Sequence, residues 1–247
     1  MGHASVVNES VRPVVVELSE RLGANLHSCI LYGSSVRGEH VAGQSDVNLL
    51  IVLNEATPEA HSGIAEAIRC EQQVEPFVLG LRGLERSQRV FALKFRSIQR
   101  HYQVLHGVDV LADFSPDDEL IRFLCEQSLR NLRLRLKHAY ITFGHDRGRY
   151  SRFVYRTLAG LRVALSETVR CEGIEVPSGT LQRIPLFERV FGVDAGILKI
   201  LVDMRAESKT MLADEICSCH ARLFTLLTHA VNWIEIRWPT INPTSLK

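Results

Sequence analysis

The hydrophobic residues of this chain follow different patterns in its two halves. In the first half, three short apolar runs predict β-strands over residues 26–32, 46–53 and 74–81. Apolar residues three and four apart predict helices over residues 10–23, 57–71 and 83–90, with Pro13 in the first turn of the first helix. Residues 92–105 form a mixed segment. The first half is therefore predicted to be a small mixed sheet covered by helices.

The second half has the spacing of helices almost throughout. Helices are predicted over residues 117–144, 150–172, 194–206 and 210–237. The change of pattern at Ser115-Pro116 predicts an α+β protein, with a mixed-sheet domain over residues 1–115 and an all-α helical bundle over residues 116–247.

Two apolar helix faces, near residues 194–204 and 222–234, leave the oligomeric state open. They either pack inside the bundle or pair with a second copy in a homodimer.

The composition sets few limits on function. The chain has 247 residues, and its 29 Lys and Arg residues balance its 28 Asp and Glu residues, which points neither to nor away from a polyanionic partner. The first residues do not have the pattern of a signal peptide, and no apolar run approaches the about 18 residues of a membrane helix. With six scattered cysteines, these features predict a cytoplasmic protein with reduced thiols and no membrane partner.

The string Cys217-Ser-Cys219-His220 has the residue types of a zinc site. Zinc needs about four ligands, commonly as two spaced pairs, and the sequence offers no convincing second pair. These thiols are therefore predicted to lie on a helix without metal.

A glycine-serine turn follows the first predicted strand. Gly33 allows the backbone to approach a bound group closely, and Ser34 offers hydroxyl and N–H donors suited to phosphate. Arg37 lies one helical turn further on and can add charge-assisted bonds to phosphate oxygens. This part of the chain is predicted to bind phosphate.

The second strand places oxygen-bearing side chains beside that turn. Asp46 and Asn48 are two residues apart in a predicted strand, so they face the same side, while Val47 and Leu49 point into the core. Two oxygen ligands next to a phosphate-binding turn suit a magnesium-bound nucleotide.

Together these strings resemble the signature of the DNA polymerase beta-type nucleotidyltransferases, which combines Gly-Ser with a later Asp-x-Asp. They are most similar to the minimal and antibiotic-modifying members, in which Gly-Ser-x-x-Arg-Gly and Ser-Asp-x-Asp-Leu occur together. The matching positions are Gly33, Ser34, Arg37, Ser45, Asp46 and Asn48. The resemblance implies that a nucleoside triphosphate is the substrate, that Mg²⁺ is the cofactor, and that a nucleoside monophosphate passes to a hydroxyl of a small molecule, protein or RNA.

The resemblance also implies three carboxylates around two metal ions, and this chain departs from that pattern. Asp46 matches the first carboxylate, Asn48 stands where the second is expected, and Glu75 is the best match for the third. An amide oxygen can bind a cation but lacks the charge that helps to hold two ions about 3.5–4 Å apart. Asp46, Asn48 and Glu75 are therefore the predicted metal ligands, for one Mg²⁺ rather than two, with Asp46 and Glu75 as the catalytic residues.

A basic stretch lies in the helical half. Residues 130–162 contain nine Lys or Arg residues and a single acidic residue, Asp146. Helical spacing predicts two stripes, one of Arg130, Arg133 and Lys137 and one of Arg149, Arg152 and Arg156. These stripes either line a groove for nucleotide phosphates, acceptor or RNA, or form a solvated surface.

Three functions stay open at this point. The first is nucleotidyl transfer, and the second is a nucleotide-binding module that has lost its metal chemistry. The third is an RNA-acting helical domain beside an inactive nucleotidyltransferase. Arg133 and His138 have the Arg-x-x-x-x-His spacing of HEPN ribonuclease domains, and the chain resembles those domains in this one string.

Overall fold

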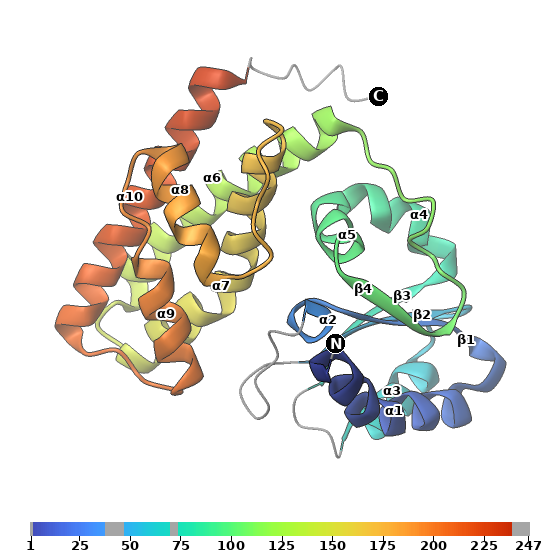
Figure 1. Cartoon of the computed structure of the whole chain (residues 1–247). Coiled ribbons are helices and arrows are strands. Elements are labelled where there is room, and N and C mark those ends of the chain that lie inside the picture. Colours follow the sequence, from blue (N-terminus) through green and yellow to red (C-terminus); the bar gives the residue numbers. More distant parts are fainter. Residues whose placement is uncertain (1, 38–46, 70–73, 239–247) are drawn as a thin grey trace. The chain divides into compact units, whose positions relative to one another are not determined.

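The chain is divided into two compact units, Met1–Pro116 and Asp117–Lys247 (Figure 1). The structure is a computed structural model that describes residues 2–37, 47–69 and 74–238, and the side chains among them except those of residues 2–10 and 37. Each unit has its own secondary structure, and the two are considered in turn.

A four-stranded mixed sheet forms the centre of the first unit. Its strands are β1 (Leu26–Tyr32), β2 (Val47–Leu53), β3 (Val74–Gly80) and β4 (Tyr102–Gly107). In the order β3-β2-β1-β4, β1 is antiparallel to both of its neighbours, and β2 is parallel to β3. The three strands predicted from the apolar runs are confirmed, apart from residue 46, which lies outside the described residues.

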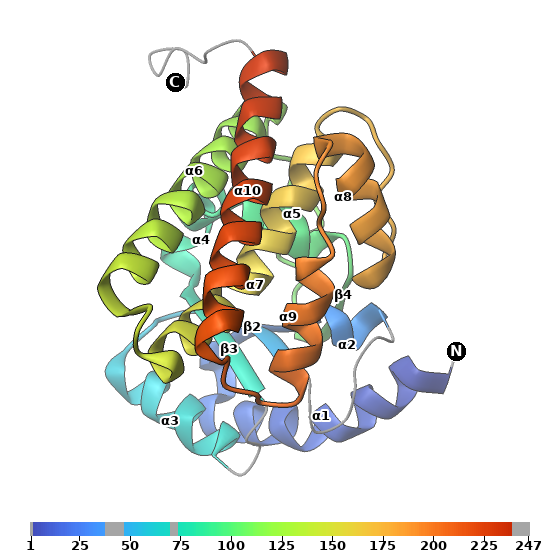
Figure 2. The same cartoon turned by 90° about the vertical axis from the view of Figure 1, so that its left-hand side faces the viewer.

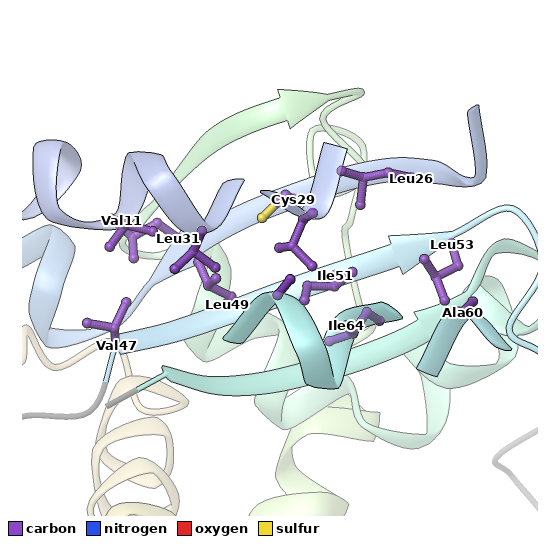
Figure 3. Close-up of a cluster of buried hydrophobic side chains, with 13 residues drawn as sticks. Val11, Leu26, Cys29, Leu31, Val47, Leu49, Ile51, Leu53, Ala60 and Ile64 are labelled. Atoms are coloured by element: carbon purple, nitrogen blue, oxygen red, sulfur yellow. The ribbon is translucent and has the colours of Figure 1, made fainter. Parts of the chain in front are cut away.

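Two helices, α1 (Gly2–Leu22) and α3 (Pro58–Ile68), cover one face of this sheet (Figure 1). Figure 3 shows the apolar side chains that gather between these helices and the strands, among them Val11, Leu31, Leu49 and Ile64. Thr57 begins α3, because its side chain accepts a hydrogen bond from the N–H of Ala60 at 3.3 Å. Removal of this apolar surface from water holds the two helices on the sheet.

The opposite face is covered by α4 (Leu81–Val90) and α5 (Ala92–Gln99). Phe95 of α5 is fully buried there against Ile30, Leu50 and Val52 of the central strands. The strands β1 and β2 are buried on both faces. They therefore do not have the alternation of polar and apolar residues that is typical of a strand with one solvent-exposed face. This burial explains the continuous apolar runs over residues 29–31 in β1 and 49–53 in β2.

Two local predictions are corrected by the structure. The mixed segment 92–105 separates into α5 and β4, because Phe95 and Ile98 face the core at helical spacing while Tyr102 pairs with Tyr32 of β1. The first helix begins at Gly2 rather than near residue 10, so Pro13 lies inside α1 and not in its first turn. Proline removes one helical N–H donor, and packing of α1 on the sheet compensates for that loss.

The second unit consists of helices. They are α6 (Asp118–Phe143), α7 (Arg147–Arg170), the short 3-10 helix η2 (Leu181–Arg183), α8 (Ile184–Phe191), α9 (Ile197–Ala206) and α10 (Ala213–Arg237). α10 packs against α6, α7, α8 and α9 (Figure 2). Helix α8 was not predicted from the sequence, where residues 184–191 form a short stretch of only two turns. The α+β class predicted from the sequence is confirmed.

The apolar faces of α9 and α10 are buried inside this unit. Leu198 and Leu201 of α9 and Leu226 and Val231 of α10 are almost fully removed from solvent. Internal packing is therefore the outcome for these two faces. Within the described part of the chain, every helix is too short or too polar to span a membrane.

Gly107 provides a test of the sheet's packing. Its φ is +74°, and a Cβ atom at this position would overlap the carbonyl oxygen of His27. Gly107→Ala therefore combines the left-handed backbone cost of about 1–2 kcal/mol with an overpacking cost of about 1–3 kcal/mol. Chemical denaturation should show a clearly lower free energy of unfolding.

Gly23→Ala is the matched control. Gly23 has φ +51°, but nothing lies within 4 Å of its Cβ position, so only the backbone cost applies. Equal losses in the two variants would contradict the close contact between β4 and β1.

Candidate nucleotide-binding site

The strand registers place four side chains in one row across the sheet. Glu75 of β3 pairs with Asn48 of β2, Asn48 pairs with Tyr32 of β1, and Tyr32 pairs with Tyr102 of β4. Residues at paired positions project from the same face, and neighbouring strands lie about 4.8 Å apart. Glu75 and Asn48 are therefore direct neighbours, although 26 residues separate them along the chain.

The glycine-serine turn lies at the same end of the sheet as this row. Gly33 follows Tyr32 directly, has φ +87°, and donates its N–H to the carbonyl oxygen of His101 at 3.2 Å. A Cβ atom on Gly33 would lie 3.5 Å from Nδ2 of Asn48, so the turn and the amide are in close proximity. The short helix α2 (Ser34–Arg37) begins immediately afterwards. The structure thus brings Gly33 next to Asn48, which in turn pairs with Glu75.

Three of the predicted site residues cannot be placed in this arrangement. Ser45 and Asp46 lie outside the described residues, and so does the side chain of Arg37. Asp46 precedes β2 by one residue in the sequence. Its role as a metal ligand stays a prediction.

The negative charge of Glu75 affects the pKa values of two neighbouring side chains, Tyr32 and Lys94. Burial raises the pKa of Tyr32 to about 12, and the negative charge of Glu75 adds to that rise. Loss of hydration lowers the pKa of Lys94, and the same carboxylate opposes this shift. The ammonium of Lys94, on α5, lies 3.8 Å from the centre of the Phe77 ring, two residues beyond Glu75 on β3. A cation therefore accompanies the carboxylate on this face of the sheet.

Tyr32 and the position of Lys94 were missed by reasoning from the sequence. The signal for Tyr32 was present, because it ends β1 one residue before Gly33, on the same strand face as Ile30. Lys94 was visible as a cation in a mixed segment, but only the helical form of α5 places it beside Phe77.

The row offers oxygen ligands with little negative charge, which suit a hard cation. Asn48 offers an amide oxygen and Glu75 a carboxylate, both of which are ligand types for Mg²⁺. In the described ranges there is no group of three His, Cys, Asp or Glu side chains able to hold a metal. An amide and one carboxylate fit one Mg²⁺ that also binds substrate phosphates, and they lack the negative charge that two ions need.

The Cys217–His220 string belongs to an aromatic cluster. The ring of His220 stacks on Tyr140 with centroids 3.9 Å apart, its Nδ1 lies 3.4 Å from the hydroxyl of Tyr150, and burial lowers its pKa. Cys219 is buried beside it on α10. Cys217 is exposed on the same helix, so both thiols lie on α10, as predicted.

The two predicted basic stripes have different surroundings. Arg130 of α6 lies between two carboxylates, Glu126 and Glu235, each 2.8 Å away. The α7 stripe instead lines a surface depression, with Arg149, Arg152 and Arg156. The residues of the α6 stripe, Arg130, Arg133 and Lys137, are not among those that line it. The arginine that α6 contributes is Arg135, because helix geometry points it to the side opposite Arg130 and Lys137.

The mixed sheet with its glycine-serine turn and the helical unit share their fold with an adenyltransferase of known structure, in agreement with the fold that the resemblance predicted. The similarity is to a solved structure of spectinomycin adenyltransferase AAD(9) from Enterococcus faecialis, which holds ATP and spectinomycin. It covers 92% of this chain and 98% of that one, with a TM-score of 0.55 and 13% sequence identity. Identity this low shows the shared fold alone. No protein-family model and no curated protein sequence matches the chain.

The charge of Glu75 can be tested through its neighbours. Glu75→Gln should lower the pKa of Tyr32, because the tyrosinate no longer faces a negative charge. It should also lower the pKa of Lys94, because the ammonium loses a favourable partner. NMR titration of ¹³C-labelled tyrosine rings and lysine amines, assigned with Tyr32→Phe and Lys94→Arg, measures both values.

Glu66→Gln removes an exposed carboxylate from α3, on the other face of the sheet, and should leave both pKa values unchanged. A Glu75→Gln variant that behaves like this control would contradict the arrangement of Glu75, Tyr32 and Lys94.

Proposed function

We propose that this chain is a nucleotidyltransferase that binds a nucleoside triphosphate with Mg²⁺ and transfers the nucleoside monophosphate to a hydroxyl acceptor. The observation that carries the proposal is the pairing of Asn48 with Glu75 beside the Gly33 turn. It brings an amide oxygen and a carboxylate next to the backbone that would hold a phosphate. The fold shared with an adenyltransferase supports the same chemistry.

In this proposal the turn binds the triphosphate. Gly33 permits close approach of the phosphate oxygens, Ser34 donates hydrogen bonds to them, and Arg37 and Ser45 add further donors. The ammonium of Lys94, beside Phe77, adds positive charge on the same sheet face. Binding in this form requires few protein ligands for the cation, since the phosphates themselves supply oxygen.

Asp46, Asn48 and Glu75 would hold Mg²⁺. Bound there, Mg²⁺ would stabilise the negative charge that develops on the phosphate oxygens. In the transfer step, the acceptor oxygen attacks the α-phosphorus, and the bond between that phosphorus and the pyrophosphate oxygen breaks. Glu75 accepts the acceptor's proton, because it is the described carboxylate of the row and its charge reaches both Tyr32 and Lys94.

The acceptor is proposed to be a small molecule with a free hydroxyl. The similar adenyltransferase was solved with spectinomycin, and the similarity extends over nearly the whole of both chains, including the helical unit. A protein or RNA hydroxyl is the competing acceptor class, which the transfer experiment below separates by product size.

One observation favours a second candidate, a nucleotide-binding protein without transfer activity. Asn48 removes a negative charge from the place where the class has a carboxylate, and the phosphate-binding turn does not depend on that charge. The HEPN-like interpretation gains no support from the fold. Arg133 and His138 lie five residues apart on α6, whereas helical side chains meet at spacings of three or four.

Calorimetry with ATP separates the two candidates. The wild-type chain should bind ATP more tightly with Mg²⁺ than with EDTA, and Asp46→Ala should remove that difference. Asn48→Asp should increase it, because the second carboxylate restores negative charge at the metal site. Ser34→Ala should weaken binding in both conditions. ATP binding that ignores Mg²⁺ and Asp46→Ala would favour the binding protein.

Transfer itself can be followed with α-³²P-labelled nucleoside triphosphates and a cell extract. Label should appear in small molecules, and Glu75→Gln should slow the reaction by about 10²–10⁴-fold, the usual contribution of a general base. The matched control Glu66→Gln should retain the wild-type rate. Label in protein or RNA would reassign the acceptor, and an active Glu75→Gln variant would show that another group accepts the proton.

A further inference from the structure

A depression of about 310 Å³ lies on the surface of the helical unit, between α6 and α7. Four arginines line it: Arg135, Arg149, Arg152 and Arg156. Two aromatic residues, Phe143 and Phe153, also line the depression. The volume is in the lower range of small-ligand sites, which begin near about 300 Å³.

These four arginines have no carboxylate partner among the residues that the structure describes. Every one of them is exposed, and none forms an ion pair there. The nearby acid Asp146 caps α7, where its carboxylate accepts the backbone N–H of Arg149 at 3.0 Å. Arg130 and Arg222, by contrast, each hold a carboxylate within 2.8 Å. Four converging like charges repel one another, and a bound anion would relieve that repulsion.

The two phenylalanines hold arginines in the depression. The guanidinium of Arg149 lies 5.0 Å from the ring centre of Phe143, and that of Arg135 lies 5.8 Å from the ring centre of Phe153. The two rings meet edge to face at 6.1 Å. A guanidinium over a ring keeps its N–H groups available along its edges, where they can bind oxygen in a forked geometry. Less side-chain entropy is then lost on binding.

We propose that this depression is a binding site for a phosphorylated small molecule with at least two adjacent phosphate charges. Guanidinium groups match phosphate oxygens in geometry and charge, and four of them can neutralise such a ligand fully. The proposal concerns the unit Asp117–Lys247 alone and does not depend on the function proposed for the Gly33 turn.

A compact ligand fits these observations better than a nucleic acid strand. A strand needs a continuous basic track and exposed ring faces on which bases stack. Here the α6 stripe does not continue the arginine cluster, since Arg130 is occupied by Glu126 and Glu235. The rings of Phe143 and Phe153 are engaged by arginines. The charges converge on one volume, as a short polyphosphate requires.

Inorganic tripolyphosphate is the probe for this site. Calorimetry on the full chain in EDTA should detect its binding without metal. Arg152→Gln and Arg156→Gln should each weaken that binding by about tenfold or more, as expected for loss of a hydrogen bond between charged groups. Arg152→Lys, which keeps the charge but loses the fork, should have a smaller effect.

Arg133→Gln is the matched control, because it removes an arginine of α6 that does not line the depression. It should leave tripolyphosphate affinity within about twofold. Circular dichroism and thermal unfolding verify that all variants are folded.

Four results would overturn the proposal. The first is absence of binding, and the second is equal loss in Arg133→Gln and Arg152→Gln. The third is affinity for RNA oligonucleotides that exceeds that for tripolyphosphate and rises with length. Loss of binding in Ser34→Ala, with Arg152→Gln unaffected, would assign the anion to the Gly33 turn instead and would also contradict it.

Discussion

The pairing register of β2 is the constraint on which the proposed nucleotide-binding site depends. Leu49 and Ile51 are buried against α1 and α3, while Leu50 and Val52 are buried against α5. Because side chains alternate between the faces of a strand, a slip of one residue would exchange these two sets. It would also turn Asn48 toward α1 and α3, away from Tyr32. Burial of β2 on both faces therefore fixes the face of the sheet on which Asn48, the polar residue near the start of this apolar strand, lies.

The same register makes the chemistry of the site a matter of local charge. Asn48 and Glu75 lie side by side, so the substitution of an amide for a carboxylate acts directly on the neighbouring group. In the proposed site, less negative charge would leave less need of a second metal ion, and the cation Lys94 lies on the same face. With Mg²⁺ bound as proposed, such a site would rely more on the phosphates of its ligand than a site with three carboxylates.

In the helical unit, the arrangement of acids decides which arginines are available. Arg130 is engaged because α10 brings Glu235 to it, and α6 itself supplies Glu126 one turn away. Beside the arginine cluster of α7, the carboxylate of Asp146 is engaged as the cap of that helix. Within the described residues, the basic stretch is thus divided into arginines that pair with acids and arginines that do not, a division that depends on contacts between helices.

The sequence alone determined the features that local chemistry controls. Short apolar runs predicted β1, β2 and β3, and the change to helical spacing at Ser115-Pro116 predicted the α+β class. Glu75 was named from a resemblance, but its position beside Asn48 was decided by strand pairing. Tertiary structure also decided the secondary structure of residues 92–105 and the position of Lys94 beside Phe77. It likewise decided that Arg135, and not Arg130, lines the depression beside the α7 arginines. Each of them is set by packing between segments far apart in the chain, and local periodicity carries no information about such partners.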